Sequence, residues 1–479
     1  MSFEWPVVQI DNIKADVKNA ITIGPFGSRM KSDCYVESGV PVIRGTNLGQ
    51  TSNFINGFVY ISEDKADQLA SCNVYKNDIV FPHRGSIGEV GIVENDKRYV
   101  LSSSLMKLTC DPNKACPKFI YYFFKSNTGR HELLKNASQV GTPGIGQPLS
   151  SLKSIELSLP PLRVQEKIAV ILGGVDKKID LNWQINQTLE KMAQALFKSW
   201  FVDFEPVKAK MAVLDAGGSQ EDATLAAMTT ISGKGADALA VFEHEHPEQY
   251  AELKAMAELF PSALQDSELG KIPEGWSIGK LGDIIEFNPK RLLKKGSFAS
   301  YLDMKNVPIT GHSAREVIER EFNSGSKFKN GDTLLARITP CLENGKTAYV
   351  DFLPTDEIVG WGSTEFIVMR SRNNLPLSLS YFFARLDSFR TIAIQSMQGT
   401  SGRQRTDASV LEQYVWILPP NKLLQKFGAF SDLILNGNRS RNNENKSLSQ
   451  LRDTLLPKLL SGEITLTEAE QSVSEVENV

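Results

Sequence analysis

Three short stretches of the sequence carry residue types that could do chemistry. "PCLENGKT" (340–347) ends like a phosphate-binding loop, "HEH" (244–246) could ligate a metal, and "FNPK" (287–290) could belong to an amino-methyltransferase loop. Each lacks a necessary partner: Pro340 stands where a phosphate loop needs glycine, no Cys or His cluster accompanies "HEH", and "FNPK" lacks an aromatic residue and a glycine-rich cofactor loop. Without a GxSxG motif and with five histidines, the chain is predicted to be non-catalytic. We expect a surface hairpin at the first stretch and a solvated helix at the second.

The chain repeats itself at an offset near 259 residues. Asn47 aligns with Asn306, and Tyr122 with Tyr381, each tyrosine followed by two phenylalanines. Further matches, in the same order, are "GTPG" (141–144) with "GTSG" (399–402), "LPP" (159–161) with "LPP" (418–420), and, at an offset of 254, residues 75–93 with 328–350. Five ordered matches indicate an internal duplication, and the period is too long for a solenoid.

Each half begins with short apolar runs cut by Gly, Asn and Pro, a pattern typical of strands, with occasional helical stretches. Each "LPP" then stops the strand and starts a long helical pattern. The sequence therefore predicts an α+β fold: two duplicated globular domains separated by a pair of long helices. The predicted boundaries are a first domain at 1–158, a first helix at 159–205, an acidic connector at 206–272, a second domain at 273–418, a second helix at 419–465 and an acidic tail at 466–479.

The first long helix has an a/d seam with alternating spacing of four and three. Its members are Ile168, Leu172, Val175, Ile179, Asn182, Asn186, Leu189, Ala193, Leu196 and Trp200. The second helix repeats the plan with Phe427, Ile434, Leu448, Leu455 and Leu459, and with Arg441, Asn445 and Arg452 in its middle. Pro457 should kink or end it. The seams fit an antiparallel coiled coil between the two helices, and they also fit two separate surface helices, each packed on its own domain.

The net charge of −3 is the sum of two acidic segments and a basic remainder. Residues 215–268 hold eleven acids and two bases, and residues 463–479 hold five acids and no base, which leaves 51 bases against 40 acids elsewhere. This distribution is compatible with nucleic-acid binding without proving it. Five cysteines without a CxxC pair, no signal-peptide pattern and no membrane-spanning run lead us to expect a cytoplasmic protein without membrane contact.

Several strings together resemble the specificity (S) subunit of type I restriction–modification systems. They are "GSRMKSDCYVESGVPVIRGTNL", "NDIVFPHRGSIG", "ELSLPPLRVQEKIAVI", "MAQALFKSWFVDFEPVKAKM", "ELGKIPEGW", "GTSGRQR" and "LRDTLLPKLLSGEI". The resemblance covers almost the whole chain. It implies that each half carries a target recognition domain that reads one part of a split, asymmetric site in double-stranded DNA.

The resemblance also implies partners and cofactors. The helices would form an antiparallel coiled coil that sets the distance between the two parts of the site and docks two methylase (modification) subunits. Those subunits would bring S-adenosylmethionine for adenine methylation in host defence, and restriction subunits would bring an ATP- and Mg-dependent translocase and nuclease. No cofactor is expected in this chain. The halves differ at one early loop, where Asp303 replaces Arg44, so Arg44 has no basic equivalent in the second half.

Reading bases requires side chains with fixed donors and acceptors, together with phosphate anchors, and such residues gather in the predicted loops. The candidate DNA contacts are Lys31, Arg44, His83, Arg84, Thr142, Gln147, Arg337, Thr400, Arg403, Gln404 and Arg405. The candidate coiled-coil or partner contacts are Ile168, Leu172, Val175, Ile179, Asn182, Asn186, Leu189, Leu196, Leu448 and Leu455. The rival interpretation is a coiled-coil adaptor that binds only protein. A cryptic enzyme would need a cofactor loop that the sequence does not offer.

Overall fold

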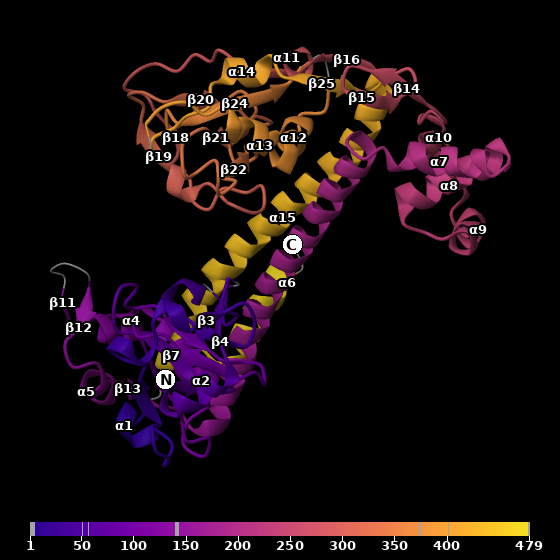
Figure 1. The fold of residues 1–479 in the computed structure, drawn as a ribbon. Helices are drawn as coiled ribbons and strands as arrows, with labels where there is room; N and C mark the ends of the chain where they lie inside the picture. Colours follow the sequence, from indigo (N-terminus) through magenta and orange to yellow (C-terminus); the bar gives the residue numbers. More distant parts are fainter. Residues whose placement is uncertain are drawn as a thin grey trace. The chain divides into compact units, whose positions relative to one another are not determined.

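The computed structural model describes residues 5–49, 51–55, 57–138, 143–372, 375–400 and 402–477. The chain divides into two compact units, unit 1 (Met1–Trp183 with Asn442–Val479) and unit 2 (Gln184–Arg441). The long helices α6 (Leu162–Phe201) and α15 (Asn421–Ser461) each contribute to both units (Figure 1). Each unit is therefore described with its own parts of both helices.

Two sheets and two short strand pairs form the globular part of unit 1. The four-stranded sheet has the order β2 (Ile21–Ile23), β10 (Leu105–Leu108), β7 (Ile79–Pro82) and β8 (Gly91–Ile92). The five-stranded sheet has the order β3 (Tyr35–Val36), β5 (Val59–Ile61), β4 (Val40–Ile43), β9 (Tyr99–Leu101) and β6 (Asn73–Val74). β1 (Val7–Gln9) pairs with β13 (Glu156–Ser158), and β11 (Ala137–Ser138) pairs with β12 (Gly144–Ile145). The helices are α1 (Ile10–Ile13), α2 (Glu63–Gln68), α3 (Pro117–Lys125), α4 (Asn127–Leu134) and α5 (Pro148–Lys153).

Unit 2 repeats this plan. Its first sheet has the order β17 (Ile285–Phe287), β24 (Phe366–Ser371), β21 (Thr333–Ala336) and β22 (Thr347–Tyr349). Its second has the order β19 (Ile318–Glu321), β18 (Phe298–Leu302), β23 (Gly360–Gly362) and β20 (Ser326–Phe328), and β16 (Ser277–Lys280) pairs with β25 (Val415–Leu418). Helices α11 (Leu281–Ile284), α12 (Leu379–Arg385), α13 (Asp387–Gln395) and α14 (Ala408–Glu412) follow in the same order as α1, α3, α4 and α5.

The duplication predicted from sequence is thus visible in strand pairing. β4 and β9 are parallel neighbours in unit 1, as β18 and β23 are in unit 2, although the other sheet pairings are antiparallel. The aromatic helices α3 and α12 are buried in the two cores, with Tyr122 and Tyr381 at equivalent positions. Burial of these large rings is the main hydrophobic contribution of each helix.

Both doubled prolines stand where a strand gives way to a long helix. β13 ends at Ser158 and α6 begins at Leu162, while β25 ends at Leu418 and α15 begins at Asn421. Proline fits the start of a helix because its missing N–H is not needed there. α15 does not end at Pro457 but continues to Ser461.

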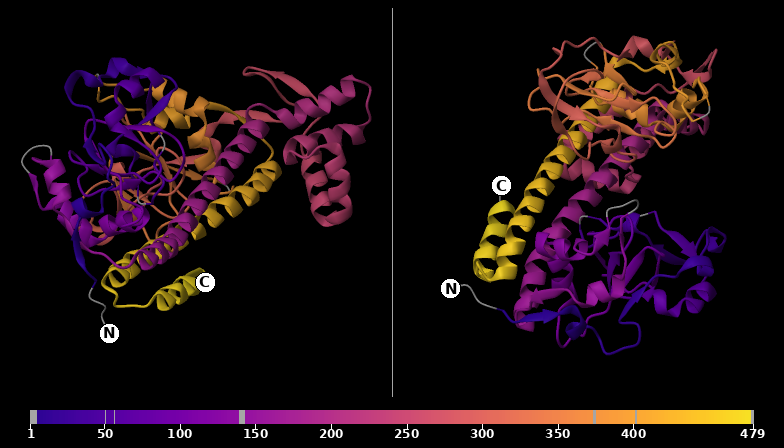
Figure 2. Two further views of the ribbon diagram at one scale, coloured as in Figure 1. Left: turned by 90° about the horizontal axis from the view of Figure 1, so that it is seen from below. Right: turned by 90° about the vertical axis from the view of Figure 1, so that its left-hand side faces the viewer.

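The long helices pack antiparallel to each other within each unit, and they lie side by side in every view (Figures 1 and 2). In unit 1, Val175 and Ile179 of α6 form an apolar cluster with Leu448 of α15. In unit 2, Phe197 and Phe201 of α6 pack around Phe427 of α15. The predicted α+β fold, with two β-rich domains and a packed pair of long helices, is confirmed.

The acidic connector folds mainly as helices. They are α7 (Glu205–Asp215), α8 (Gln220–Ser232), α9 (Ala236–Glu245) and α10 (Pro247–Glu258), followed by a hairpin of β14 (Leu264–Ser267) and β15 (Gly270–Pro273). Lys210 ties α7 to the end of this segment because its buried Nζ donates to the Phe260 carbonyl at 2.7 Å. The C-terminal residues Leu466–Glu477 form α16. Within the described residues, no helix is both long and apolar enough to cross a membrane.

Candidate functional site

In unit 1, several loops meet at one edge of the four-stranded sheet. β2 and β7 both pair antiparallel with β10, so they run in the same direction and end at the same edge. The loop after β7 lies against the loop before α5, because the Gly85 N–H donates to the Pro143 carbonyl at 2.9 Å and the Ile145 N–H to the His83 carbonyl at 3.0 Å. We call residues 83–88 and 143–147 the unit 1 loop edge.

The loop that follows β4 joins this edge. A Cβ on Gly45 would lie 2.8 Å from Ser86 Oγ, so the two loops approach each other closely here. The preceding Arg44 is half-buried, and its Nη2 donates to the Gly57 carbonyl at 2.6 Å. This contact holds the Arg44 side chain over the loop and leaves part of its guanidinium for a ligand.

The predicted DNA contacts of the first half differ in exposure. Lys31, Arg84 and Gln147 are exposed, whereas His83 is buried with Nε2 3.0 Å from the Ser103 carbonyl. Burial lowers the pKa of His83, so this histidine is neutral and packs the loop instead of offering a charge to DNA. Thr142 lies outside the described residues.

In unit 2, the equivalent loops come together in the same way. β17 and β21 both pair antiparallel with β24 and end at one edge of the sheet. The Thr339 N–H donates to the Gln404 carbonyl at 3.0 Å, and the Thr406 N–H donates to the Arg337 carbonyl at 3.0 Å. We call residues 337–339, 363–365, 398–400 and 402–406 the unit 2 loop edge.

Glu365 organises the unit 2 loop edge, and no motif in the sequence pointed to it. Arg405 Nε lies 3.0 and 2.9 Å from the two Glu365 oxygens, and Nη2 donates to Glu365 Oε1 at 2.7 Å. Arg405 lowers the pKa of Glu365, so the carboxyl is ionised. This fork-to-carboxylate pairing occupies the Arg405 donors that a base would otherwise take.

The other predicted contacts of the second half remain available. Arg403 and Thr400 are exposed, and Gln404 and Arg337 are half-buried. Arg403 follows a turn in which its N–H donates to the Thr400 carbonyl at 3.0 Å. Arg403 therefore has the freer guanidinium of the two loop arginines.

Asp303, which replaces Arg44 in the repeat, has a local role. Its carboxylate accepts from the Lys305 N–H at 2.9 Å and caps the short 3-10 helix Met304–Asn306. A capping carboxylate at this place makes the second half less attractive to phosphate than the first. The two loop edges therefore have the same architecture with different charges.

Polar residues on the long helices fix their register in unit 1. Asp176 of α6 accepts from Tyr122 Oη at 2.9 Å and from Arg452 Nη1 of α15 at 2.9 Å. Further along, Asn182 Nδ2 donates to Asn445 Oδ1 at 2.9 Å. These groups are buried, and a shift of one helix along the other would leave them unpaired.

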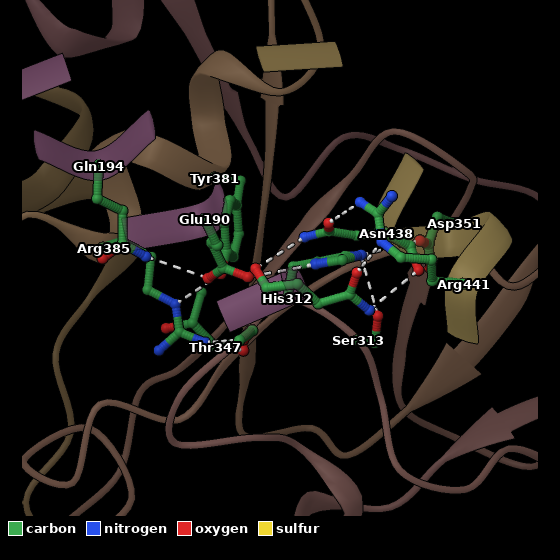
Figure 3. Close-up of polar contacts among 12 residues, drawn as sticks. Glu190, Gln194, His312, Ser313, Thr347, Asp351, Tyr381, Arg385, Asn438 and Arg441 are labelled. Atoms are coloured by element: carbon green, nitrogen blue, oxygen red, sulfur yellow. Dashed lines mark hydrogen bonds and ion pairs between the residues drawn. The ribbon is translucent and has the colours of Figure 1, made fainter. Parts of the chain in front are cut away.

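In unit 2, a larger buried network ties α6 to the globular domain (Figure 3). Glu190 of α6 accepts a hydrogen bond from Tyr381 Oη of α12 and lies 3.3 Å from His312 Nδ1. His312 Nε2 lies 3.2 Å from Asp351 Oδ2, so the imidazole stands between two carboxylates. Nearby, Arg385 donates to Tyr381 Oη at 3.0 Å.

A pair of asparagines continues the register in unit 2. Asn438 Nδ2 donates to the Asn186 carbonyl at 3.3 Å, and Arg441 Nε donates to Asn186 Oδ1 at 2.6 Å.

The predicted seam positions face the partner helix or a domain core. Ile168, Leu172, Val175, Ile179, Asn182, Asn186, Leu448 and Leu455 are buried, and Leu189 and Leu196 are partly buried.

Two of the three excluded motifs have ordinary surroundings. "HEH" lies at the end of α9, and "PCLENGKT" forms the connection from β21 to its antiparallel neighbour β22. The described residues contain no group of three or more His, Cys, Asp or Glu side chains suited to a metal ion.

Comparison with known proteins decides the family. A sequence model of the type I restriction modification DNA specificity domain matches residues 22–191. The type I restriction enzyme HindI specificity subunit of Haemophilus influenzae is 30% identical over 438 residues, which cover 87% of this chain and 93% of that protein. The chain belongs to the type I restriction–modification specificity subunits.

Other relatives share the description. The type I restriction enzyme MjaIX specificity subunit of Methanocaldococcus jannaschii is 24% identical over 432 residues, which cover 86% of this chain and 84% of that protein. A crystal structure of the S subunit of a type I system from M. genitalium aligns with a TM-score of 0.47 and 17% identity, covering 96% of this chain and 97% of that chain. As a specificity subunit, the protein is a non-catalytic part of a type I restriction enzyme.

Proposed function

We propose that each loop edge reads one part of a split, asymmetric site in double-stranded DNA. The observation that carries the proposal is the construction of one loop edge twice in a single chain, each time with different side chains. Arg84 and Gln147 are available in unit 1, and Arg403 and Gln404 in unit 2. Two unlike readers on one chain match a site whose two parts differ.

The long helices, on this proposal, set the number of base pairs between the two parts. Buried pairs such as Asp176–Arg452 and Asn182–Asn445 favour a single register of the helices, which a measuring element requires.

The helices also dock two methylase subunits in the proposal. In unit 1, α6 exposes Val170 and Leu181, which are eleven residues or about three helical turns apart, so the two side chains share one face. An exposed apolar row on a helix suits a protein partner. S-adenosylmethionine then belongs to the methylase subunits, and ATP and Mg to restriction subunits, with the complex acting in the cytoplasm.

Mapping adenine methylation tests the proposal. The chain is co-expressed with its methylase subunit, and methylated adenines are compared for the wild type, Arg403→Ala and the control Lys254→Ala, an exposed lysine of α10. We expect a two-part asymmetric site for the wild type and the control, and relaxed sequence choice in one part only for Arg403→Ala. A gel shift on random-sequence DNA at two salt concentrations provides the second readout.

The same experiments separate the proposal from a purely protein-binding adaptor. An adaptor would give no shifted DNA at either salt concentration and no dependence of the methylation pattern on Arg403. The absence of any shift at both salt concentrations would remove DNA binding from this chain, whereas an unchanged methylation pattern alone would remove only Arg403 from base reading.

A further inference from the structure

Each unit exposes one large apolar side chain in the loop that follows the first strand of one sheet. The sheet is β2-β10-β7-β8 in unit 1 and β17-β24-β21-β22 in unit 2. In unit 2, the loop 288–297 follows β17, and Leu292 is 96% exposed, the highest value among the large hydrophobic residues described. In unit 1, the loop 24–31 follows β2, and Phe26 is 62% exposed. We call these two segments the strand-exit loops. In each unit, the strand-exit loop starts at the same end of the sheet as the loop edge defined above, because β2 runs parallel to β7 and β17 runs parallel to β21.

The strand-exit loop of unit 2 is held firmly at its start and end. The Asn288 N–H donates to the Val368 carbonyl at 2.6 Å, and Asn288 Oδ1 accepts from the Val368 N–H at 3.0 Å. At the other end, the Gly296 N–H donates to the Phe322 carbonyl at 2.8 Å.

Its middle is held by a buried carboxylate. Arg291 Nη2 lies 2.8 and 2.9 Å from the two oxygens of Asp332, which is fully buried. The next two leucines then point to different surroundings, since Leu293 packs on a buried apolar cluster and Leu292 faces solvent. Leu292 is therefore presented by an anchored loop, so that ordering it against a ligand costs little further entropy.

The strand-exit loop of unit 2 is itself cationic. Lys290, Lys294 and Lys295 are exposed, and none of them forms an ion pair with another described residue. Residues 288–297 contain no acid. An apolar tip among free cations suits a polyanion that also offers apolar surface, and a DNA duplex does so with its phosphates and stacked bases.

The strand-exit loop of unit 1 repeats these features with different residues. Pro25 is buried as Pro289 is, and each is the second residue after its strand. Phe26 then faces solvent, and the exposed Arg29 and Lys31 follow it. Both halves of the duplication thus keep a buried proline, an exposed apolar side chain and exposed cations, although the sequences of the loops differ. This common arrangement indicates that both loops bind the same kind of ligand.

We propose that the strand-exit loops are additional DNA contacts, in which the cations bind phosphates and Phe26 and Leu292 wedge against a base step beside each part of the site. The inference rests on the proposed function and adds deformation of the duplex to it. Apolar side chains that enter a base step unstack it and bend the duplex. Specificity would then include the ease of unstacking that step, even where no side chain reads its bases.

The test measures binding of the full chain, in complex with its methylase subunit, to DNA duplexes. Each duplex contains the site identified by methylation mapping. 2-Aminopurine, whose fluorescence rises when it is unstacked, is placed in turn at each position beside the two parts. The variants are Leu292→Ser and the double variant Lys294→Ala/Lys295→Ala. The control is Val241→Ser, which removes an exposed apolar side chain from α9.

Leu292→Ser should weaken binding roughly tenfold and abolish the fluorescence rise beside one part only. The double lysine variant should lower the slope of log affinity against log salt by about two while keeping the fluorescence rise. Val241→Ser should behave as the wild type. Because all the substituted side chains are exposed, none of these changes should affect folding.

Three outcomes would overturn the inference, and they can be told apart. Unchanged affinity and fluorescence for Leu292→Ser, with a wild type that binds its site, would reject the wedge and leave the proposed function intact. Loss of the methylase subunit from the complex, with DNA affinity of the chain unchanged, would make the ligand a protein. A wild type that binds no DNA would reject both the inference and the proposed function.

Discussion

Replacing His312 by Gln should remove a defined part of the pH dependence of the stability of unit 2. Burial acts to lower the pKa of His312, but hydrogen bonds to Asp351 and Glu190 outweigh burial and raise it from 6.5 to about 9. The imidazolium thus stabilises the folded state by bridging two carboxylates, one from α6 and one from the globular domain. Arg385, which reaches the same network through Tyr381, supplies another nearby positive charge.

The magnitude follows from the two pKa values. Because the folded-state pKa lies above the unfolded-state value, the contribution is fully present below pH 6.5 and is lost as the pH rises to about 9. Its total is roughly 3 kcal/mol. The opposite sign applies to Glu190, whose pKa is lowered despite its burial because His312 donates to it. Its contribution fades only as the pH falls through that depressed value, so measurements between pH 6 and 9.5 isolate His312.

Urea unfolding followed by tryptophan fluorescence provides the assay. Four of the six tryptophans, Trp200, Trp276, Trp361 and Trp416, lie in unit 2, so the signal reports mainly on that unit. The difference in unfolding free energy between wild type and His312→Gln should shrink by roughly 3 kcal/mol from pH 6 to 9.5. Taking the difference between two proteins cancels the titration of groups that they share.

A matched control is His131→Gln, which changes an exposed histidine of α4 in unit 1. It should leave the free energy of unfolding unchanged at every pH in the series. If the His312→Gln difference is the same at pH 6 and pH 9.5, His312 does not carry its charge between the carboxylates, and the reasoning is refuted.

Two further predictions concern DNA contacts and one concerns the helix pair. Arg403→Ala should weaken binding to the cognate site by about 1–3 kcal/mol if Arg403 reads a base, whereas a phosphate contact would weaken all sequences and reduce the salt slope by about one. Arg405→Ala should weaken binding to all sequences because it leaves Glu365 unpaired, and adding Glu365→Gln should recover part of the loss; no recovery would contradict this role. Inserting one heptad after Gln187 and one after Gly437, which lie opposite each other beside the Asn186–Asn438 contact, should lengthen the helix pair by about 10 Å. The preferred spacer should then grow by about three base pairs, and an unchanged spacer would show that the helices do not set the distance.

The sequence predicted those features of the fold that have a regular period. The helical seam follows from apolar spacing, and the duplication follows from ordered matches such as Tyr122 with Tyr381. Of the connector helices, the one at "HEH", where α9 ends, was expected from the sequence, but α8, which is rich in Ala and has no clear apolar period, was missed. A short helix of that kind is defined by its packing neighbours more than by its own pattern.

The candidate site was predictable only in its location. Glycine-rich loops at matching points of the repeat pointed to both loop edges, yet the sequence could not tell that Arg405 pairs with Glu365, forty residues away. The network around His312 was missed for the same reason, since Glu190 and His312 are 122 residues apart. Such pairs have no spacing rule, because only the folded chain brings them together.

A half-length fragment, residues 1–204, tests how far the two halves are interchangeable. At the offset of 259, Leu448 and Leu455 of α15 correspond to Leu189 and Leu196 of α6, so a second copy of the fragment could supply an equivalent apolar seam. Arg452, however, corresponds to Ala193. In a two-fold dimer the buried Asp176 would therefore lose its ion-pair partner, although Tyr122 would still donate to it.

Ala193→Arg should therefore have opposite effects in two contexts. In the fragment it restores a partner for Asp176, and we expect dimerisation to tighten by about 2–3 kcal/mol, since an unpaired buried charge costs about 3–5 kcal/mol. In the full chain the same change forces a charged side chain into the core of unit 2, where Ala193 is fully buried, and should be destabilising. Sedimentation equilibrium of the fragment and urea unfolding of the full chain measure the two effects, with circular dichroism to check that the fragment is folded. Equal dimerisation of the fragment with and without the Ala193→Arg substitution would show that the second copy does not take the place of α15, and that the two halves are not equivalent at their helices.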